Sequence, residues 1–255
     1  MVSYVIGDVH GCLKALRALL EKVRYNPKKD KLYFIGDLVG RGPDDWGVLS
    51  LVRKLGAQVI IGNHDLHFLA THGCIEAQRN LSEDQMQDFA YYYQAKFSYY
   101  DNATDTLLVH AGIWPGWNLK EVAEKAAELE RTVLNKKAVA MLAQVLYGND
   151  EIAWSESLRG WERWRCLINI FTRMRVIDEK HQMDLDFSGE KHEIPSGKKP
   201  WYSSGKPPCQ KIVFGHWSRH GAKTDYANYD CIDGGCVWGG QLIAIELGSN
   251  VRHKL

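Results

Sequence analysis

The chain has 255 residues, of which 45% are hydrophobic and 25% charged, a composition typical of a globular protein with a sizeable core. Its 32 Lys and Arg nearly balance its 31 Asp and Glu, so the net charge of +1 does not favour broad electrostatic binding to nucleic acid or to a membrane surface. Because the chain has no apolar run of about 18 residues and no disulfide-type cysteine pattern, we expect a cytoplasmic protein with reduced thiols and no membrane partner.

The first 62 residues predict a β-α-β-α-β arrangement. Short apolar runs at 4–6, 32–35 and 59–61 are typical of strands that are buried on both faces. Between them, residues 12–23 and 44–56 place apolar side chains at helical spacing, and the second of these helices ends at a glycine. Parallel strands joined by crossover helices bring their carboxyl ends to one edge of a sheet, where α/β proteins build their sites.

Side chains that can bind metal ions follow these strands at the point where each ends. Further apolar runs at 107–109 and 212–214 end in the same way. Taken singly, an aspartate at a strand end can be a helix cap and an asparagine can be a turn residue. A histidine there can be a core residue whose hydrogen bonds are satisfied. Their joint occurrence, at strand ends expected along the same edge of one sheet, favours a metal site instead. The residues are Asp8, His10, Asp37, Asn63, His64, His110 and His216.

The rest of the chain is less regular. Residues 82–96 and 118–134 predict amphipathic helices. Residues 148–205 are rich in Trp, Arg, Gly, Lys and Pro, and we expect an irregular, partly helical insertion or lid there within a single domain that spans 1–255. Residues 225–247 predict two or three strands with glycine turns, which we expect to form a second small sheet.

Carboxylate, imidazole and amide ligands without thiolates suit Mn, Fe, Co, Ni or Zn. The candidates are too many for one ion, which favours a two-metal site. Two divalent ions would be only partly neutralised by Asp8 and Asp37, so the site would attract phosphate. Ions roughly 3.5–4 Å apart can share a hydroxide and hold the attacking and leaving oxygens of an in-line displacement.

The motifs D-x-H, G-D, G-N-H-D, H-A-G and G-H, in this order from residue 8 to residue 216, resemble those of the calcineurin-like metallophosphoesterase family. The resemblance implies an α/β fold, a β-sandwich of two mixed sheets flanked by helices. It also implies a role for each residue. Asp8 and His10 would bind the first ion, Asp37 would bridge both, Asn63, His110 and His216 would bind the second, His64 would be the general acid, and Arg41 would hold a phosphate oxygen.

One branch of the family fits best. Protein phosphatases of the family carry an aspartate that orients the catalytic histidine, whereas this chain has Gly40 in GDLVGRGP. The stretches FTRMR and DGGCVWGG are similar to the branch that splits dinucleoside tetraphosphates symmetrically into two nucleoside diphosphates. This resemblance implies a dinucleoside polyphosphate substrate and two divalent ions, with Mn or Co favoured. A phosphoprotein phosphatase, an RNA 5′-end phosphatase and a metal-bound scaffold without catalysis stay as alternatives.

A tetraphosphate bridge needs cationic contacts besides the metal ions. Arginines suit phosphate because their guanidinium forms forked contacts. Of the arginines in the insertion we favour Arg159 and Arg173 for this role, although each can equally be a surface residue or an ion-pair partner. Tryptophans can stack on a nucleobase, although they more often lie in the core. The tryptophans considered for stacking are Trp114, Trp117, Trp161 and Trp164.

Overall fold

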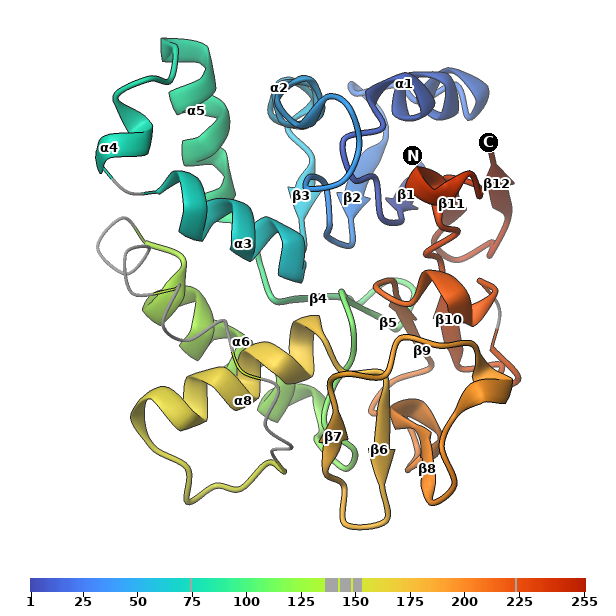
Figure 1. Cartoon of the computed structure of the whole chain (residues 1–255). Helices are drawn as coiled ribbons and strands as arrows, with labels where there is room; N and C mark the ends of the chain where they lie inside the picture. The colour runs from blue at the N-terminus through green and yellow to red at the C-terminus, as the bar shows by residue number, and fades with distance from the viewer. Residues whose placement is uncertain (74, 136–141, 143–147, 149–152, 223) are drawn as a thin grey trace.

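The computed structural model describes residues 1–73, 75–135, 142, 148, 153–222 and 224–255 (Figure 1). The predicted β-α-β-α-β start is confirmed. It consists of β1 (Ser3–Ile6), α1 (Leu13–Lys22), β2 (Lys31–Phe34), α2 (Asp45–Leu55) and β3 (Gln58–Val59). β1 pairs in parallel with β2, and β2 with β3, so their carboxyl ends point the same way.

The strands form two main mixed sheets, which confirms the implied fold class. A five-stranded sheet has the order β12-β11-β1-β2-β3, and a four-stranded sheet has the order β10-β9-β5-β4. The strands of these two sheets that follow β3 are β4 (Ser98–Asp101), β5 (Thr106–Val109), β9 (Lys211–Phe214), β10 (Tyr229–Cys231), β11 (Ile243–Glu246) and β12 (Arg252–Lys254).

Two sequence-based expectations about the sheets are wrong. The metal-capable strand ends do not share one sheet, because β1 to β3 lie in the first sheet and β5 and β9 in the second. Residues 225–247 do not form a sheet of their own. Instead β11 pairs antiparallel with β1, while β10 pairs in parallel with β9, so the C-terminal strands complete both main sheets.

Apolar side chains between the sheets hold the sandwich together. Val5, Tyr33 and Ile245 of the first sheet share one buried cluster with Leu108 and Val213 of the second. Successive side chains of a strand point to opposite faces. The neighbouring residues of β1 and β2, such as Ile6 and Phe34, therefore pack in the larger cluster that includes α1 and α2. In Figure 1 these two helices lie along the outer side of the first sheet.

The helices predicted in the middle of the chain are confirmed. The α-helices after α2 are α3 (Asn63–His72), α4 (Ile75–Gln78), α5 (Glu83–Tyr91), α6 (Leu119–Val133) and α8 (Gly160–Thr172). Short 3₁₀ helices are η1 (Tyr92–Gln94), η2 (Lys191–Glu193), η3 (Trp201–Ser203), η4 (Ser218–His220) and η5 (Cys236–Trp238). Ser82 and Asn118 cap α5 and α6 by accepting hydrogen bonds from backbone N–H groups. Within the described ranges, no helix is both long and apolar enough to cross a bilayer.

Residues 148–205 are more regular than expected, although residues 149–152 lie outside the described ranges. This region supplies α8 and a third sheet of β6 (Val176–Asp178), β7 (Met183–Asp184) and β8 (Lys198–Pro200), in the order β7-β6-β8. The sequence pattern missed this sheet because its strands have only two or three residues. The C-terminal half of α8 is buried, and its Phe171 accepts a backbone hydrogen bond from Ala111 (2.8 Å).

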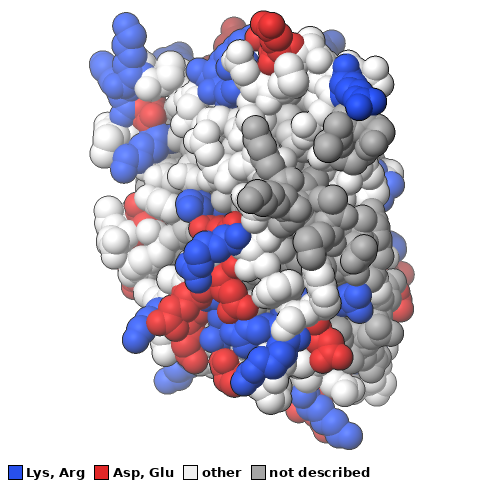
Figure 2. All heavy atoms as spheres, turned by 90° about the vertical axis from the view of Figure 1, so that its left-hand side faces the viewer, with Lys and Arg blue, Asp and Glu red and all other residues white. Residues whose placement is uncertain are grey.

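Basic and acidic side chains are interspersed on the face that carries α3, α5, α6 and α8 (Figure 2). Several of them are paired across these helices. Arg163 of α8 donates to Glu128 of α6 at 2.8 Å, and Lys125 lies 3.0 Å from Glu156. The described part of this face therefore shows no field of one sign, in agreement with the net charge of +1.

Candidate metal centre

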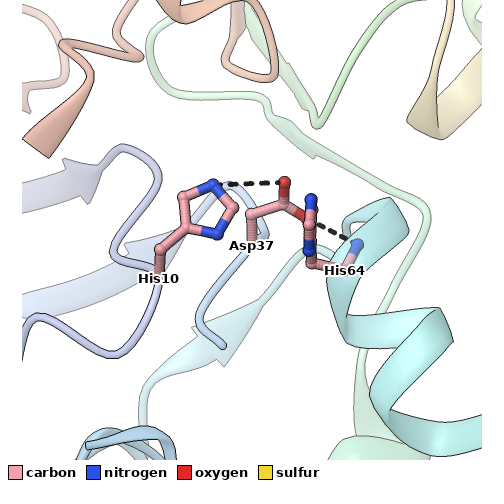
Figure 3. Close-up of side chains that lie close together, drawn as sticks. All are labelled: His10, Asp37 and His64. Carbon is pink, nitrogen blue, oxygen red and sulfur yellow. Dashed lines mark hydrogen bonds and ion pairs between the residues drawn. The ribbon is translucent and has the colours of Figure 1, made fainter. Parts of the chain in front are cut away.

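The loops after β1 and β2 and the first turn of α3 bring His10, Asp37 and His64 together (Figure 3). The His10 Nε2 atom lies 3.6 Å from Asp37 Oδ2, and the His64 backbone N donates to Asp37 Oδ1 at 2.9 Å. One potential ligand atom from each residue lies within 4.8 Å of the others. These residues therefore form the first of two groups that have the size of a metal site.

The second group shares Asp37 with the first. It adds His110, which follows β5, and His216, which follows β9, again with ligand atoms within 4.8 Å. His110 Nε2 lies 3.5 Å from Asp37 Oδ1 and 3.3 Å from the Asn63 Oδ1 atom. The sandwich thus joins strand ends from both sheets, and Asp37 belongs to both groups, while its role as a bridging ligand stays a prediction.

The backbone around these side chains is unusual. His10, Asp37 and His216 have φ values of 48°, 50° and 64°, a left-handed region that non-glycine residues rarely adopt. Such conformations cost on the order of 1 kcal/mol or more each and cluster at functional sites. Glycines beside the site allow close packing, since a Cβ on Gly62 would lie 2.2 Å from Asp37 Oδ1.

Asp8, a predicted ligand of the first ion, lies just outside both groups. It is buried, and its Oδ2 atom accepts a hydrogen bond from the backbone N of His216 at 3.1 Å. Among the residues described, neither metal-sized group includes Asp8. Its contact with the loop after β9 nevertheless ties the two sheets together behind the site, and its ligand role stays a prediction.

The charges around the site are suited to cations. Asp8, Asp37 and Asp233 are all buried. Burial, above all, raises the pKa of each, and the charge of Asp233 adds to this for Asp8 and Asp37. Among the described cations, Arg175 is the one whose charge favours ionisation of both Asp37 and Asp233. Divalent ions would supply the positive charge that these carboxylates need.

His110 and His216 are in the protonation state that binds metal. Burial lowers the pKa of His110 to about 4 and that of His216 well below its ordinary value. Both imidazoles are therefore neutral at pH 7 and can offer a ring nitrogen to an ion. The Nδ1 atom of His110 lies 2.7 Å from the Ile35 carbonyl, which leaves its Nε2 atom facing the site.

Comparison with known proteins identifies the family. The model of the calcineurin-like phosphoesterase family matches residues 1–240. The chain belongs to this family. A Marinomonas protein named symmetrical bis(5′-nucleosyl)-tetraphosphatase is 39% identical, with 100% of this chain and 96% of the relative covered. A Stutzerimonas stutzeri protein of the same name is 36% identical over 100% of this chain and 97% of the relative.

A solved structure supports the fold. A crystal structure described as "a putative diadenosine tetraphosphatase" is similar with a TM-score of 0.67 and 22% identity, over 100% of this chain and 92% of the other. Membership of this family implies that the protein uses divalent metal ions. Among the described residues, the two groups that share Asp37 could hold them.

Asp65 positions the bridging candidate of this phosphoesterase. Its buried carboxylate accepts hydrogen bonds from the backbone N–H groups of Asp37 (2.8 Å), Gly62 (2.9 Å) and Leu38 (2.9 Å) and from the Tyr92 hydroxyl (2.9 Å). The sequence analysis did not single it out, although it is the last residue of the G-N-H-D motif. Asp233 was missed as well, although it lies two residues after the end of β10, as Asp8 lies two residues after the end of β1.

His64 has no orienting carboxylate in the described structure, and its ring is held by packing. It lies edge-to-face against His10, with ring centroids 4.8 Å apart. On the other side Gly40, with a φ of 110°, approaches so closely that a Cβ there would lie 2.7 Å from His64 Nδ1. Burial, followed by the charges of His10 and Arg41, lowers the pKa of His64 to about 3, so the imidazole is neutral at pH 7.

Gly40→Ala is expected to lower kcat on the order of 10²-fold, the scale of a misplaced catalytic group, while bound metal is retained. The added methyl group would displace the His64 ring. Gly56→Ala is the matched control, because Gly56 also has a positive φ (62°) but nothing within 4 Å of the added Cβ. Kinetics and elemental analysis of both variants test this. An equal loss of activity in both would show that backbone strain alone is responsible.

A cavity of about 620 Å³ surrounds the site, and its lining includes Arg41, Arg175 and Arg219. The predicted phosphate contacts Arg159 and Arg173 are not among the lining residues. The Arg159 guanidinium donates to the carbonyls of Glu156 and Leu158 (2.6 and 2.8 Å). Arg173 donates to the Asn169 side chain (3.3 Å), although its own carbonyl lies 3.1 Å from His216 Nε2. Their substrate roles stay predictions.

The tryptophans considered for base stacking lie away from this cavity. Trp114 and Trp117 are buried in the core. Trp161 and Trp164 pack against each other on α8, with ring centroids 5.2 Å apart. Two tryptophans do line the cavity, the buried Trp217 and the exposed Trp238 of the DGGCVWGG stretch, and neither was predicted to belong to the site.

Proposed function

We propose that this phosphoesterase hydrolyses diadenosine tetraphosphate and related dinucleoside polyphosphates symmetrically, into two nucleoside diphosphates, with two divalent ions. The observation that carries the proposal is the position of Asp37, which belongs to both metal-sized groups and lines a cavity that three arginines also line. The printed names of the full-length relatives support the substrate. The donor set favours Mn or Co, and it is also compatible with Fe, Ni or Zn.

His10 and Asp37, with Asp8 behind them, would hold one ion, and Asp37, Asn63, His110 and His216 would hold the other. Bound ions would supply a nucleophilic hydroxide at neutral pH and would offset the charge on phosphate. His64 would protonate the leaving oxygen. Because nearby negative charge raises the proton affinity of an imidazole, the leaving phosphate itself would help His64 to hold that proton. Arg41 would hold a phosphate oxygen through its guanidinium.

The negatively charged phosphate bridge of the substrate requires cationic side chains in addition to the two metal ions. Arg41, Arg175 and Arg219 surround the cavity and would contact the outer part of the phosphate bridge. Arg173 joins this proposal through its position next to His216. Arg159 joins it only as an arginine of the insertion whose guanidinium is suited to phosphate. The proposal also includes a cytoplasmic location and one domain over residues 1–255, with the insertion around 148–205 packed into the same core.

Product analysis tests the function. With Mn or Co present, we expect diadenosine tetraphosphate to yield ADP as the sole early product, because a central register places the second phosphate at the ions. Chromatography of the first few per cent of turnover measures this. ATP and AMP in equal amounts would overturn the symmetric register. A higher kcat/KM on a phosphopeptide or on a 5′-capped RNA would favour the corresponding alternative instead.

A further inference from the structure

We propose that Trp238 is the surface on which a nucleobase of the substrate stacks. The inference rests on the proposed function and adds a specificity-determining residue to it. Trp238 is 66% exposed, a large apolar ring left in contact with water. It belongs to η5 and lines the same cavity as His10, Asp37 and His64. An exposed aromatic face beside a phosphate site is suited to the flat, apolar face of a base.

Arg41, which lies beside Trp238, connects the proposed base site with the phosphate site. The Arg41 guanidinium lies 5.7 Å from the centroid of the Trp238 ring, within the range of a cation–π contact. Arg41 is also the residue that we assign to a phosphate oxygen. A nucleotide carries its base one sugar away from its first phosphate, so an aromatic ring next to the phosphate-binding arginine is placed to meet that base.

The loop that carries Trp238 is well anchored. Gly235 donates to Asp233 Oδ1 (3.0 Å), and its own carbonyl accepts from the backbone N–H groups of Trp238 (2.9 Å) and Gly240 (3.0 Å). A Cβ on Gly240 would lie 2.1 Å from the Gly234 carbonyl, so this turn is closely packed. The ring is thus presented from a preorganised turn tied to a buried carboxylate of the site, which lowers the entropy cost of binding.

Kinetics on one substrate that carries a nucleobase and on one that does not test the proposal. Trp238→Ala should raise KM for diadenosine tetraphosphate roughly 5- to 100-fold, the range of base–aromatic stacking, and leave kcat nearly unchanged. The same variant should raise KM for p-nitrophenyl phosphate far less, because that substrate has no base and can lose only what the Trp238 ring contributes through Arg41. Trp238→Phe should keep most of the affinity because it keeps an aromatic face. Trp161→Ala is the matched control, since Trp161 is 40% exposed but does not line the cavity.

A binding measurement separates this inference from the proposed function. Titration with ADP in the presence of Mn should quench tryptophan fluorescence in the wild type and in Trp161→Ala, and Trp238→Ala should lose that quenching. A wild type that hydrolyses p-nitrophenyl phosphate but not diadenosine tetraphosphate would refute the proposed function. The inference fails instead if Trp238→Ala keeps the wild-type KM for diadenosine tetraphosphate and the wild-type quenching. Equal KM increases on both substrates would also overturn it, because a merely structural role would not distinguish them.

Discussion

Asp37→Ala is expected to remove bound metal and activity together. Asp37 belongs to both groups of potential ligands, so its loss would remove the carboxylate that the two proposed ion sites share. Mutation of residues that only support a ligand typically lowers metal affinity 10- to 100-fold, and a shared ligand should cost more than about 100-fold. Elemental analysis and kcat, measured side by side, test the prediction, and activity should not return at ordinary Mn concentrations.

Asp88→Ala provides the matched control for Asp37→Ala. Asp88 is another buried carboxylate, but it pairs with Arg53 on α2 and lies outside both groups. We expect this control to lower the free energy of unfolding and to keep the metal content. Circular dichroism should show that Asp37→Ala itself is folded. Near-normal metal content and kcat in Asp37→Ala would rule out the bridging role.

His64→Asn is expected to lower kcat by roughly 10²–10⁴-fold, the usual contribution of a positioned general acid, with little loss of metal. His64 contacts Asp37 through its backbone N–H, which the substitution keeps. The defect should depend on the leaving group. It should be large for diadenosine tetraphosphate and much smaller for p-nitrophenyl phosphate, because p-nitrophenolate needs little protonation to depart.

Two measurements decide the role of His64. A Brønsted-type comparison over phenyl phosphates of rising leaving-group pKa should show a steeper decline for His64→Asn than for the wild type. Parallel lines for the two proteins would argue against proton donation. A loss of metal comparable with that of Asp37→Ala would instead assign His64 to ion binding, as its membership of the first group permits.

Much of the fold's first half was predictable because local patterns determine it. The alternation of apolar runs and helical spacing in the first 62 residues identified β1 to β3 with α1 and α2. The third sheet was not predictable in this way, since β6, β7 and β8 are too short for a periodic signal. The partition of strands between two sheets was also beyond local patterns, because pairings such as Val5 with Ile245 join residues far apart in the sequence.

The sequence by itself determined which chemistry is available, because imidazole, carboxylate and amide groups at strand ends are a property of residue order. It therefore pointed to Asp8, His10, Asp37, Asn63, His64, His110 and His216 before any contact was known. Only the tertiary structure decided which cations and rings surround these groups. Arg175 reaches the site from the segment between α8 and β6 and Trp238 from a turn after β10, and both positions depend on long-range packing that no local spacing encodes.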